Sequence, residues 1–386
     1  MIPQIFINDL GSLIVFIIGV IIALIISRYF QCSFPRSIII YLWHSLFCFA
    51  YVWYSLDHAA DSNYYYISSF NSHIKFSFGI PAVLLLTSIF SKTLGLSYLA
   101  TSLVYSIFGF IGLIAFDSAL RSVVNPKDIK TRNIATIIIF IPSLSFWSSG
   151  LGKDSLALLS IGLLLWAAIQ YRRRIWLFAP AVLIMMIIRP HIAVIMIISM
   201  AISIVIQKQL PIILRAVISI IILISSIIII PIGAKYIGLE SISESKPILN
   251  YINLQSKINM EGGSSINITA MPLPMKIGTY LFRPFFFDAK SIYFMISSID
   301  NAFLLYLFII GVNKMTKIRY YFFYQNRAFI WSYALITLLV LSMTTANLGI
   351  SVRQKWMVMP MFIFLIISVL GKNKHPKVIS PKKYLF

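Results

Sequence analysis

Apolar stretches long enough to form helices recur along the whole chain and are separated by short polar segments. A helix needs about 20 mostly apolar residues to cross a bilayer. By this criterion the hydropathy pattern predicts about eleven spans, near residues 10–27, 37–56, 97–116, 133–148, 155–170, 175–188, 192–206, 212–233, 293–312, 328–346 and 356–370. We therefore expect an all-α, polytopic integral membrane protein in which residues 1–386 form a single transmembrane domain.

One apolar stretch, residues 79–91, does not fit this scheme. Its sequence GIPAVLLLTSIFS has 13 residues, which is short for a span. If it crossed the membrane, the basic residues after the next span would fall on the outer side. We expect it to re-enter the membrane or to lie on its outer surface, within a first outer loop of residues 57–96. A larger outer loop is expected at residues 234–292, where GGSS and two prolines are typical of a mobile lid.

The composition indicates that lipid is the solvent of this chain. Its 386 residues are 59% hydrophobic and 11% charged, which is more apolar surface than a soluble fold of this size could bury. The opening MIPQIFINDL has no basic segment and no cleavage site follows it, so we expect a retained first span and no signal peptide. Two cysteines and five histidines show no spacing typical of disulfides or metal ligands. We expect no metal and no cofactor.

Basic residues are sorted unevenly between the two sets of loops. The chain carries 32 basic and 11 acidic residues, a net charge of +21. With the N-terminus outside, twenty of the basic residues but only Asp117 and Asp128 fall on the inner side, as the positive-inside rule requires. We therefore expect an outer N-terminus, a cytoplasmic C-terminus and a lipid bilayer as partner. A nucleic-acid partner is not expected, because it would require no such sorting into short loops.

Four separate outer hairpins nevertheless bring basic groups to one level of the membrane. They are GLGKDS with Lys153 and Asp154, RPH with Arg189 and His191, FRPFFFDAK with Arg283 and Asp288, and SVRQKW with Arg353 and Lys355. Charges at membrane depth are costly unless they are paired or face a water-filled cavity, so this gathering predicts a functional site. Simpler interpretations are also open: Asp154 can cap a helix, and Arg189 and Arg353 can be anchors that reach lipid headgroups.

The first outer loop carries the complementary charge. It reads YSLDHAADSNYYYISSFNSH, with Asp57 and Asp61 four residues apart. If the second span continues as a helix to this point, that spacing puts both carboxylates on one face. The tyrosines that follow have the ordinary interpretation of interfacial belt residues. Carboxylates that face a basic rim supply a base and an anion clamp, so we expect Asp57 or Asp61 to be the catalytic base.

Several of these segments resemble those of a known group of membrane enzymes. IPSLSFWSSGLGKDSLALL, IIRPHIAV, YLFRPFFFDA and NLGISVRQKWMVMP are similar to motifs of bacterial O-antigen and exopolysaccharide polymerases of the Wzy type. The acidic first outer loop also resembles that of the GT-C superfamily of lipid-sugar-dependent glycosyltransferases. Two features depart from these patterns. The acidic pair follows the second span instead of the first, which implies an extra N-terminal helix, and large outer loops with evenly repeated arginines are not evident.

The resemblance implies a GT-C-like fold and a function in lipopolysaccharide or exopolysaccharide assembly at the bacterial inner membrane. The donor would be an undecaprenyl-diphosphate-linked glycan, the acceptor a second lipid-linked glycan, and a chain-length regulator a further partner. The departing diphosphate needs cations, and the groups expected to supply them are Arg189, Arg283, Arg353 and Lys355, assisted by Lys153 and His191. Asp154 and Asp288 would orient these groups, and Asp57 or Asp61 would take the proton of the acceptor hydroxyl.

Two other classes of membrane protein are alternatives. A transporter or flippase for lipid-linked glycans is expected to carry ionisable groups near mid-membrane and an internal repeat. Only Asp300 and Arg215 lie well inside predicted spans, and no repeat is evident. A membrane acyltransferase is expected to have a His-centred site, which the sequence does not show. Both alternatives therefore rank below the glycosyltransferase.

Overall fold

The computed structural model of this chain is helical throughout the residues that it describes, which are 10–125, 128–206, 213, 216, 264–268, 271–289, 291–317 and 326–370. Within these ranges the extended pairing is limited to one isolated bridge between Ser265 and Asn347. The predicted all-α class is therefore confirmed. The predicted span at 212–233 falls almost wholly outside the described residues, as does the predicted loop at 234–292 up to residue 263.

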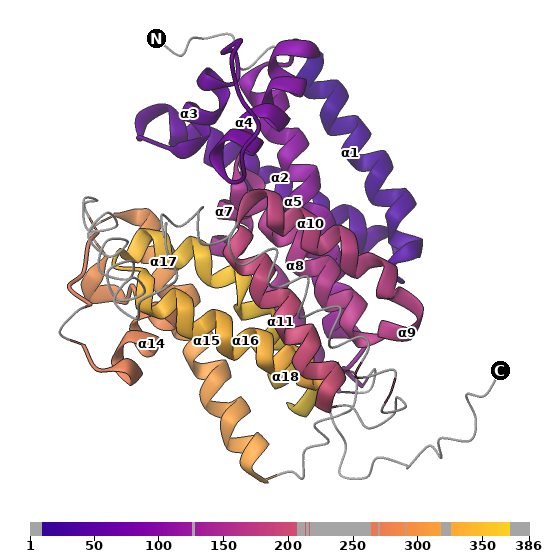
Figure 1. Cartoon of the computed structure of the whole chain (residues 1–386), viewed down its shortest axis with the longest axis vertical. Coiled ribbons are helices and arrows are strands. Elements are labelled where there is room, and N and C mark those ends of the chain that lie inside the picture. Colours follow the sequence, from indigo (N-terminus) through magenta and orange to yellow (C-terminus); the bar gives the residue numbers. More distant parts are fainter. Residues whose placement is uncertain are drawn as a thin grey trace.

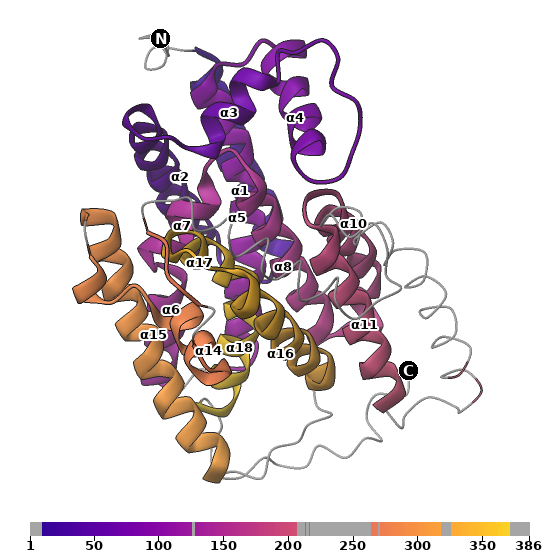
Figure 2. The same cartoon turned by 60° about the vertical axis from the view of Figure 1, so that its left-hand side comes forward.

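The helices run back and forth between two ends of one bundle (Figures 1 and 2). In chain order they are α1 (Leu10–Tyr29), α2 (Phe34–Asp57), α3 (Asp61–Ser68), α4 (Ile80–Ser88), α5 (Tyr98–Arg121), α6 (Ile129–Ile139), α7 (Pro142–Ser149), α8 (Lys153–Ile169), α9 (Tyr171–Arg174), α10 (Phe178–Ile188), α11 (Pro190–Ile206), α14 (Leu273–Phe282), α15 (Ile292–Lys317), α16 (Arg327–Thr344), α17 (Leu348–Gln354) and α18 (Met359–Leu370). Short π or 3-10 turns lie between some of these helices, at Ile89–Thr93, Ile175–Leu177, Phe286–Asp288 and Lys355–Met357.

Within the described residues, six helical segments are long and apolar enough to cross a membrane. They are α1, α2, α5, the α6–α7 pair, α15 and α16. Helices α17 and α18, bent by 57° at their junction, would together make a seventh. The apolar helices α10 and α11, and the segment of α4 with its π turn, are shorter. The described part of the chain therefore has the architecture of a multi-pass membrane protein, whereas the predicted number of eleven spans stays a prediction.

The centre of the bundle is the contact between α5 and α8. A side-chain carbon added to Gly162 of α8 would lie 2.1 Å from the carbonyl oxygen of Gly112 in α5, and one added to Gly112 would lie 2.3 Å from the carbonyl oxygen of Leu158. The two backbones touch, because small residues at helix interfaces in membranes allow such close approach. Nearly every residue of these two helices is buried, so they fix the positions of the others.

An ion pair ties the start of α2 to the far end of α5. Arg36 Nε and Nη2 donate to the two oxygens of the Asp117 carboxylate at 2.8 and 2.6 Å. Asp117 is fully buried, and a buried charge is tolerated only with a well-placed partner. Because Arg36 supplies that partner, the pair holds α2 against α5 at the end of the bundle opposite the first outer loop.

The apolar segment at 79–91 forms α4 and its π turn. The Gly79 backbone N–H donates to the carbonyl oxygen of Ile187 at 2.7 Å, which attaches the start of α4 to the end of α10. Helix α4 also packs against α3 (Figure 2). The segment therefore lies at the same end of the bundle as the RPH turn. Whether it re-enters a bilayer or lies on it stays a prediction.

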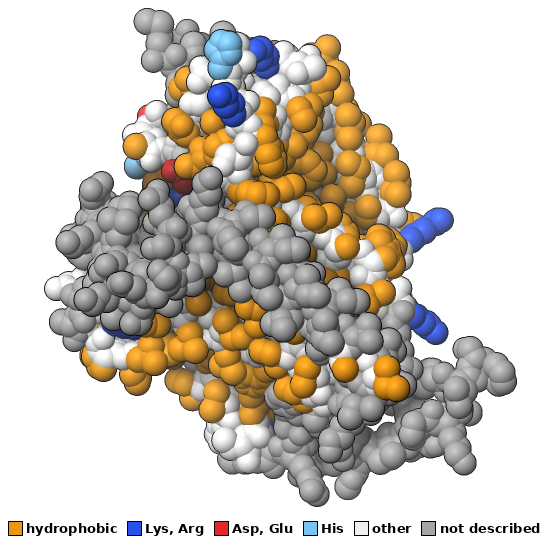
Figure 3. Space-filling view, viewed as in Figure 1, with side chains coloured by type: hydrophobic (Ala, Val, Ile, Leu, Met, Phe, Trp, Pro, Cys, Tyr) orange, Lys and Arg blue, Asp and Glu red, His pale blue; other side chains and the backbone are white. Residues whose placement is uncertain are grey.

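The surface of the described helices is largely apolar. Figure 3 shows hydrophobic side chains over much of the described surface on one face, with the few visible Lys and Arg side chains at its edges. The exposed hydrophobic residues of the described helices include large ones such as Ile25, Trp53 and Leu183, each of which is more than half exposed. A contiguous apolar surface of this extent indicates contact with lipid.

Candidate functional site

Four charged residues from separate parts of the chain form a continuous set of ion pairs, which we call the ionic network. The Arg353 guanidinium lies between two carboxylates: Nε donates to Asp154 Oδ2 and Nη2 donates to Asp61 Oδ2, each at 2.8 Å. Arg189 Nη2 donates to the other oxygen of Asp154 at 3.2 Å. The network therefore joins α3, α8, the α10–α11 junction and α17, and three of the four hairpins predicted from the sequence meet here.

Asp154 is positioned by the turn that the sequence GLGKDS makes before α8. Gly152 has φ of +158°, a conformation that residues with a side chain rarely adopt. Lys153 begins α8 and Asp154 follows it, in a first turn whose dipole favours a negative charge. No side chain caps this helix, and the Asp154 carboxylate binds two arginines instead. The interpretation of Asp154 as a simple cap is therefore wrong.

The two arginines of the network are held by helix ends. Arg189 occupies the break between α10 and α11, because Pro190 begins the next helix. Arg353 lies at the end of α17, whose start is capped by Asn347 Oδ1, which accepts from Gly349 N at 2.8 Å. Its guanidinium also lies 5.3 Å from the centre of the Trp147 ring. Both side chains point toward Asp154, so the interpretation of Arg189 and Arg353 as headgroup anchors is wrong.

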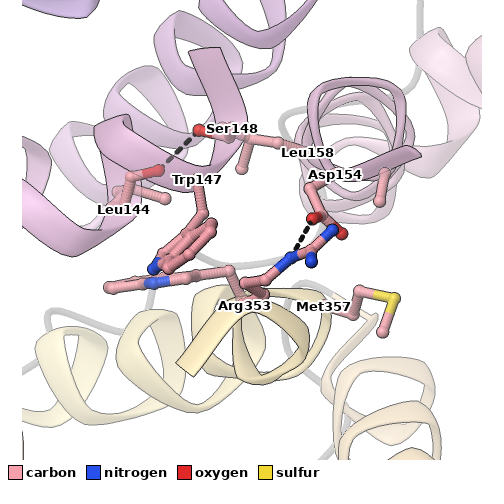
Figure 4. A pocket seen from close by; sticks show the side chains of 9 residues that line it. Leu144, Trp147, Ser148, Asp154, Leu158, Arg353 and Met357 are labelled. Carbon is pink, nitrogen blue, oxygen red and sulfur yellow. Dashed lines mark hydrogen bonds and ion pairs between the residues drawn. The ribbon is translucent and has the colours of Figure 1, made fainter. Parts of the chain in front are cut away.

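The inner part of the network is closed to ligands. Figure 4 shows the Asp154–Arg353 pair enclosed by side chains of α7, α8 and the turn after α17, among them Leu144, Trp147, Ser148, Leu158 and Met357. The space there is about 10 Å³, room for at most one water molecule. The Asp154 side chain is 11% exposed, whereas that of Asp61 is 54% exposed. Only the Asp61 end of the network therefore meets solvent.

A cavity of about 600 Å³, which we call the outer cavity, opens beside this exposed end. Its walls include Tyr54 and His58 at the end of α2, and Leu348 of α17. Phe287 and Phe294 add aromatic rings, and three serines add hydroxyl groups. Ala59, two residues before Asp61, also lines it. Its volume lies in the range of small-molecule sites. Asp61 and Arg353 themselves do not line it, so the cavity and the exposed end of the network are neighbours and not one pocket.

A second ion pair, Arg283–Asp288, lines the outer cavity. Arg283 Nε and Nη2 donate to the two Asp288 oxygens at 3.0 and 2.5 Å, and Phe285 N donates to Asp288 Oδ2 at 2.9 Å. The guanidinium holds the pKa of the Asp288 carboxyl below its usual range, and the carboxylate raises the pKa of Arg283. Asp288 orients Arg283 as the sequence predicts. The pair stays outside the ionic network, so the expected single rim divides into two groups.

An aromatic wall separates the two groups. The Tyr54 ring lies 6.4 Å from that of Trp147, over which Arg353 is placed, and 4.5 Å from that of Tyr293. On its other side Tyr54 stacks on the His58 imidazole at 4.1 Å. The ionic network and the outer cavity are thus neighbours that share one wall.

Lys355 occupies a third environment in the bundle interior. Its Nζ donates to Asn301 Oδ1, and Asn301 Nδ2 donates to the carbonyl oxygen of Pro284 at 2.9 Å. The adjacent Asp300 Oδ2 accepts from Ser143 N, at the start of α7, at 2.8 Å. Lys355 is fully buried, so the expectation that it lies on an open cationic rim is wrong. Through Asn301 it supports the FRPFFFD turn that lines the outer cavity.

The acidic pair of the first outer loop is not on one helical face. Helix α2 ends at Asp57, His58 is extended with φ of −124° and ψ of 148°, and α3 begins at Asp61. The helix does not continue, so that expectation is wrong. Asp61 joins the ionic network, whereas Asp57 is exposed and forms no ion pair with any described residue. His191 lies in the first turn of α11, and its assisting role, like that of Lys153, stays a prediction.

Sequence reasoning missed the aromatic wall and Asn301. Tyr51, whose ring contacts that of Tyr54, and Tyr54 lie three positions apart in α2, and His58 follows directly after the helix; this spacing was visible in the sequence. Asn301 follows Asp300 inside an apolar helix, and neighbouring polar residues in a span indicate a buried contact. The contacts to Pro284 and Lys355 have no such signal, because both partners are distant in sequence.

No three His, Cys, Asp or Glu side chains within the described ranges lie close enough together to hold a metal ion. The chemistry available at the site is that of carboxylates, guanidinium groups, hydroxyls and aromatic rings. No known protein family, curated protein or solved structure shows significant similarity to this chain.

Proposed function

We propose that this chain is a GT-C-like membrane glycosyltransferase with about eleven spans. It transfers a glycan from an undecaprenyl-diphosphate-linked donor to an acceptor glycan on the extracytoplasmic face of a bacterial inner membrane, and thereby polymerises O-antigen or exopolysaccharide. One observation carries the proposal: the Arg353–Asp61 pair, with its half-exposed carboxylate, lies near a cavity of about 600 Å³ that includes Ala59 in its wall, at one end of an apolar helical bundle. A cation, a carboxylate and room for a polar substrate are the requirements of such a transfer.

The Arg353–Asp61 contact suggests how the donor binds. A phosphate oxygen carries the same charge as the Asp61 carboxylate and accepts the same N–H groups, so the donor diphosphate can replace Asp61 on Arg353 Nη2. Arg353 keeps its orientation during this exchange, because Nε remains bound to Asp154. Lys153 and Arg189, next to Asp154, add positive charge on the same side. Donor binding therefore releases the Asp61 carboxylate in place.

The released carboxylate then acts as general base. The acceptor hydroxyl oxygen forms a bond to the anomeric carbon of the donor sugar, and the bond from that carbon to the phosphate oxygen breaks. The diphosphate leaves with the bonding electron pair, and the hydroxyl proton passes to Asp61. Arg353 stabilises the charge that develops on the departing phosphate. General-base assistance of this kind contributes about 10²- to 10⁴-fold to the rate.

Reconstitution tests the proposal. The purified protein is placed in liposomes with lipid-linked repeat units extracted from membranes of the producing cells, and product length is followed on gels. We expect a ladder of lengthened glycans that the Asp61→Asn variant does not make. Translocation of the lipid-linked unit without any lengthening would contradict the transferase and favour a flippase.

The flippase is a second candidate because of one specific feature. The bend of 57° between α17 and α18 has the geometry of a broken span or of a re-entrant loop, and Asp300 and Lys355 are buried beside it. Interrupted helices and ionisable groups inside the membrane are typical of transporters. The same liposomes, scored for movement of the lipid-linked unit across the bilayer, measure this alternative directly.

Cysteine labelling tests the proposed orientation. On the Cys32→Ser, Cys48→Ser background, a single cysteine at position 61 should react with a membrane-impermeant reagent added outside, and one at position 130 should react only after permeabilisation. Outside labelling of position 130 would show that residues 79–91 cross the membrane.

A further inference from the structure

We propose that the outer cavity binds the uncharged sugar units of a glycan and not its diphosphate. This inference rests on the proposed function and names the part of the substrate that the cavity takes. It also changes the role of Arg283, which the sequence assigned to phosphate binding.

The charges on the described wall of the cavity cancel. Arg283 and Asp288 are the charged residues there, and they bind each other through two hydrogen bonds. A phosphate could take the two-bond position on Nε and Nη2 only by displacing Asp288, which also accepts from Phe285 N, and at any other N–H it would meet the nearby carboxylate charge. Anion sites in proteins instead present N–H donors in excess of acceptors. The Arg283–Asp288 pair is therefore poorly suited to a diphosphate.

The same pair suits hydroxyl groups. A guanidinium has five N–H donors, of which Nε–H and one on Nη2 bind Asp288, so Asp288 leaves three donors of this cavity-lining residue unused. Asp288 Oδ2 already accepts from Arg283 Nε and Phe285 N, whereas Oδ1 accepts only from Arg283 Nη2 among the described residues and so has a second lone pair. The pair thus offers donors and acceptors side by side without net charge, as adjacent sugar hydroxyls require. Ser264, Ser265 and Ser291 add hydroxyls to the same wall.

Aromatic rings supply the other half of a sugar site. Phe287 is 79% exposed, and Tyr54 and Phe294 line the same space. A pyranose ring has an apolar C–H face and a polar rim, so it packs on an aromatic ring while its hydroxyls bond to polar groups. Phe287 therefore presents an exposed ring beside polar groups of the cavity wall, on which a sugar ring can pack.

The neighbouring ionic network differs in its charge balance. Its two arginines and two carboxylates cancel, and Lys153, which precedes Asp154 at the start of α8, gives this region a net positive charge; its outermost carboxylate is the exposed Asp61. The excess positive charge next to an uncharged cavity matches a lipid-linked glycan, whose diphosphate adjoins its first sugar. The diphosphate then lies at the Arg353 end, and the sugars extend into the outer cavity.

Binding measurements on the full-length protein in detergent test the inference. The protein is applied to an array of uncharged bacterial oligosaccharides and, separately, titrated with inorganic pyrophosphate. We expect at least one oligosaccharide to bind with little dependence on salt, and Phe287→Ala and Asp288→Asn each to weaken it about tenfold. Phe76→Ala, which removes a similarly exposed ring (64%) elsewhere in the first outer loop, is the matched control and should bind normally. Pyrophosphate binding should fall in Arg353→Gln and persist in Arg283→Gln.

Three outcomes would overturn the inference: no array glycan binds, glycan binding is unchanged in Phe287→Ala, or pyrophosphate binding is lost in Arg283→Gln. These results are separable from those of the liposome assay. Glycan binding without chain growth would contradict the proposed transferase and support the sugar site. Chain growth with pyrophosphate bound at Arg283 would support the transferase and contradict the sugar site.

Discussion

The ionic network and the outer cavity use the same pair of residue types in opposite ways. In the network, Arg353 and Asp154 are 199 positions apart in sequence, and the space around their contact is about 10 Å³. In the cavity, Arg283 and Asp288 are five positions apart and border about 600 Å³. The first contact holds distant helices together, and the second shapes one turn at a surface open to ligands. The two are therefore expected to respond differently to substitution.

The largest effect is expected from Asp154→Ala. It leaves Arg189 and Arg353 without their shared carboxylate in a site that is nearly closed to water, and breaking a buried pair in this way costs about 3 to 5 kcal/mol. Thermal unfolding in detergent, followed by tryptophan fluorescence, measures it. Asp288→Ala is the matched comparison, and its loss should stay at about 1 kcal/mol because Arg283 borders the outer cavity, where water can solvate its guanidinium. Equal losses in both variants would remove the distinction between the two regions.

Next in size is the effect of Asp61→Asn on transfer. The substitution keeps the side-chain shape and removes the base, so chain growth should fall about 10²- to 10⁴-fold while the unfolding temperature changes little. Asp57→Asn is the control, because Asp57 has no ion pair among the described residues and should retain activity. If the two variants behave alike, either both active or both inactive, the assignment of the base to Asp61 fails.

Arginine-to-lysine substitutions should distinguish the contributions of Arg353 and Arg189 to chain growth. Arg353 contacts two carboxylates through two nitrogens, which a single ammonium group cannot reproduce, so Arg353→Lys should slow chain growth by about 10- to 100-fold. Arg189 makes one longer contact of 3.2 Å, so Arg189→Lys should cost less than about tenfold. Initial rates in the liposome assay decide the order, and a larger effect at Arg189 would shift the diphosphate site toward the α10–α11 junction.

Asn301→Ala should affect the outer cavity from a distance. It removes the hydrogen bond that holds the Pro284 carbonyl and leaves the buried Lys355 ammonium without this acceptor, at a cost of about 1 to 3 kcal/mol. We expect weaker glycan binding with unchanged pyrophosphate binding. Ser297→Ala, also in α15, serves as control, because its hydroxyl bonds only within the helix, to the Tyr293 carbonyl. A proportional loss of both ligands would mean general destabilisation and no positioning role.

The smallest effect is expected from pH. The folded pKa of Asp288 lies below its unfolded value of about 4, so the contribution of the Arg283–Asp288 pair is complete above that value and is lost only as the pH falls through the lower folded pKa. The contribution of this pair to glycan binding should therefore be constant from about pH 8 to about pH 5. Binding on the array at several pH values measures it, and a midpoint above pH 5 that Asp288→Asn abolishes would contradict the assignment.

The sequence predicted what depends on local pattern. Apolar runs located most of the described helices, and the GLGKDS, RPH and SVRQKW turns were expected at one level because charges at membrane depth need partners. The sequence could not specify which partner each charge takes. Arg283 binds Asp288 inside its own turn, and Lys355 binds Asn301 from another helix. The helix break after Asp57 was also missed, because its only signal was a short polar segment that a helix could equally have included.

The contact between Gly162 and Gly112 fixes the point about which α8 can tilt. Asp154 lies eight positions from this point, about 12 Å along the helix, so a tilt of about 5° would move its carboxylate about 1 Å sideways. A larger residue in place of Gly162 would push the two helices apart at this contact, because its added carbon would lie 2.1 Å from the backbone oxygen of Gly112. Displacements of about 1 Å at a reacting centre can cost about 100-fold in rate. A single methyl group at Gly162, deep in the bundle, would therefore lower the rate of transfer at the outer end of α8.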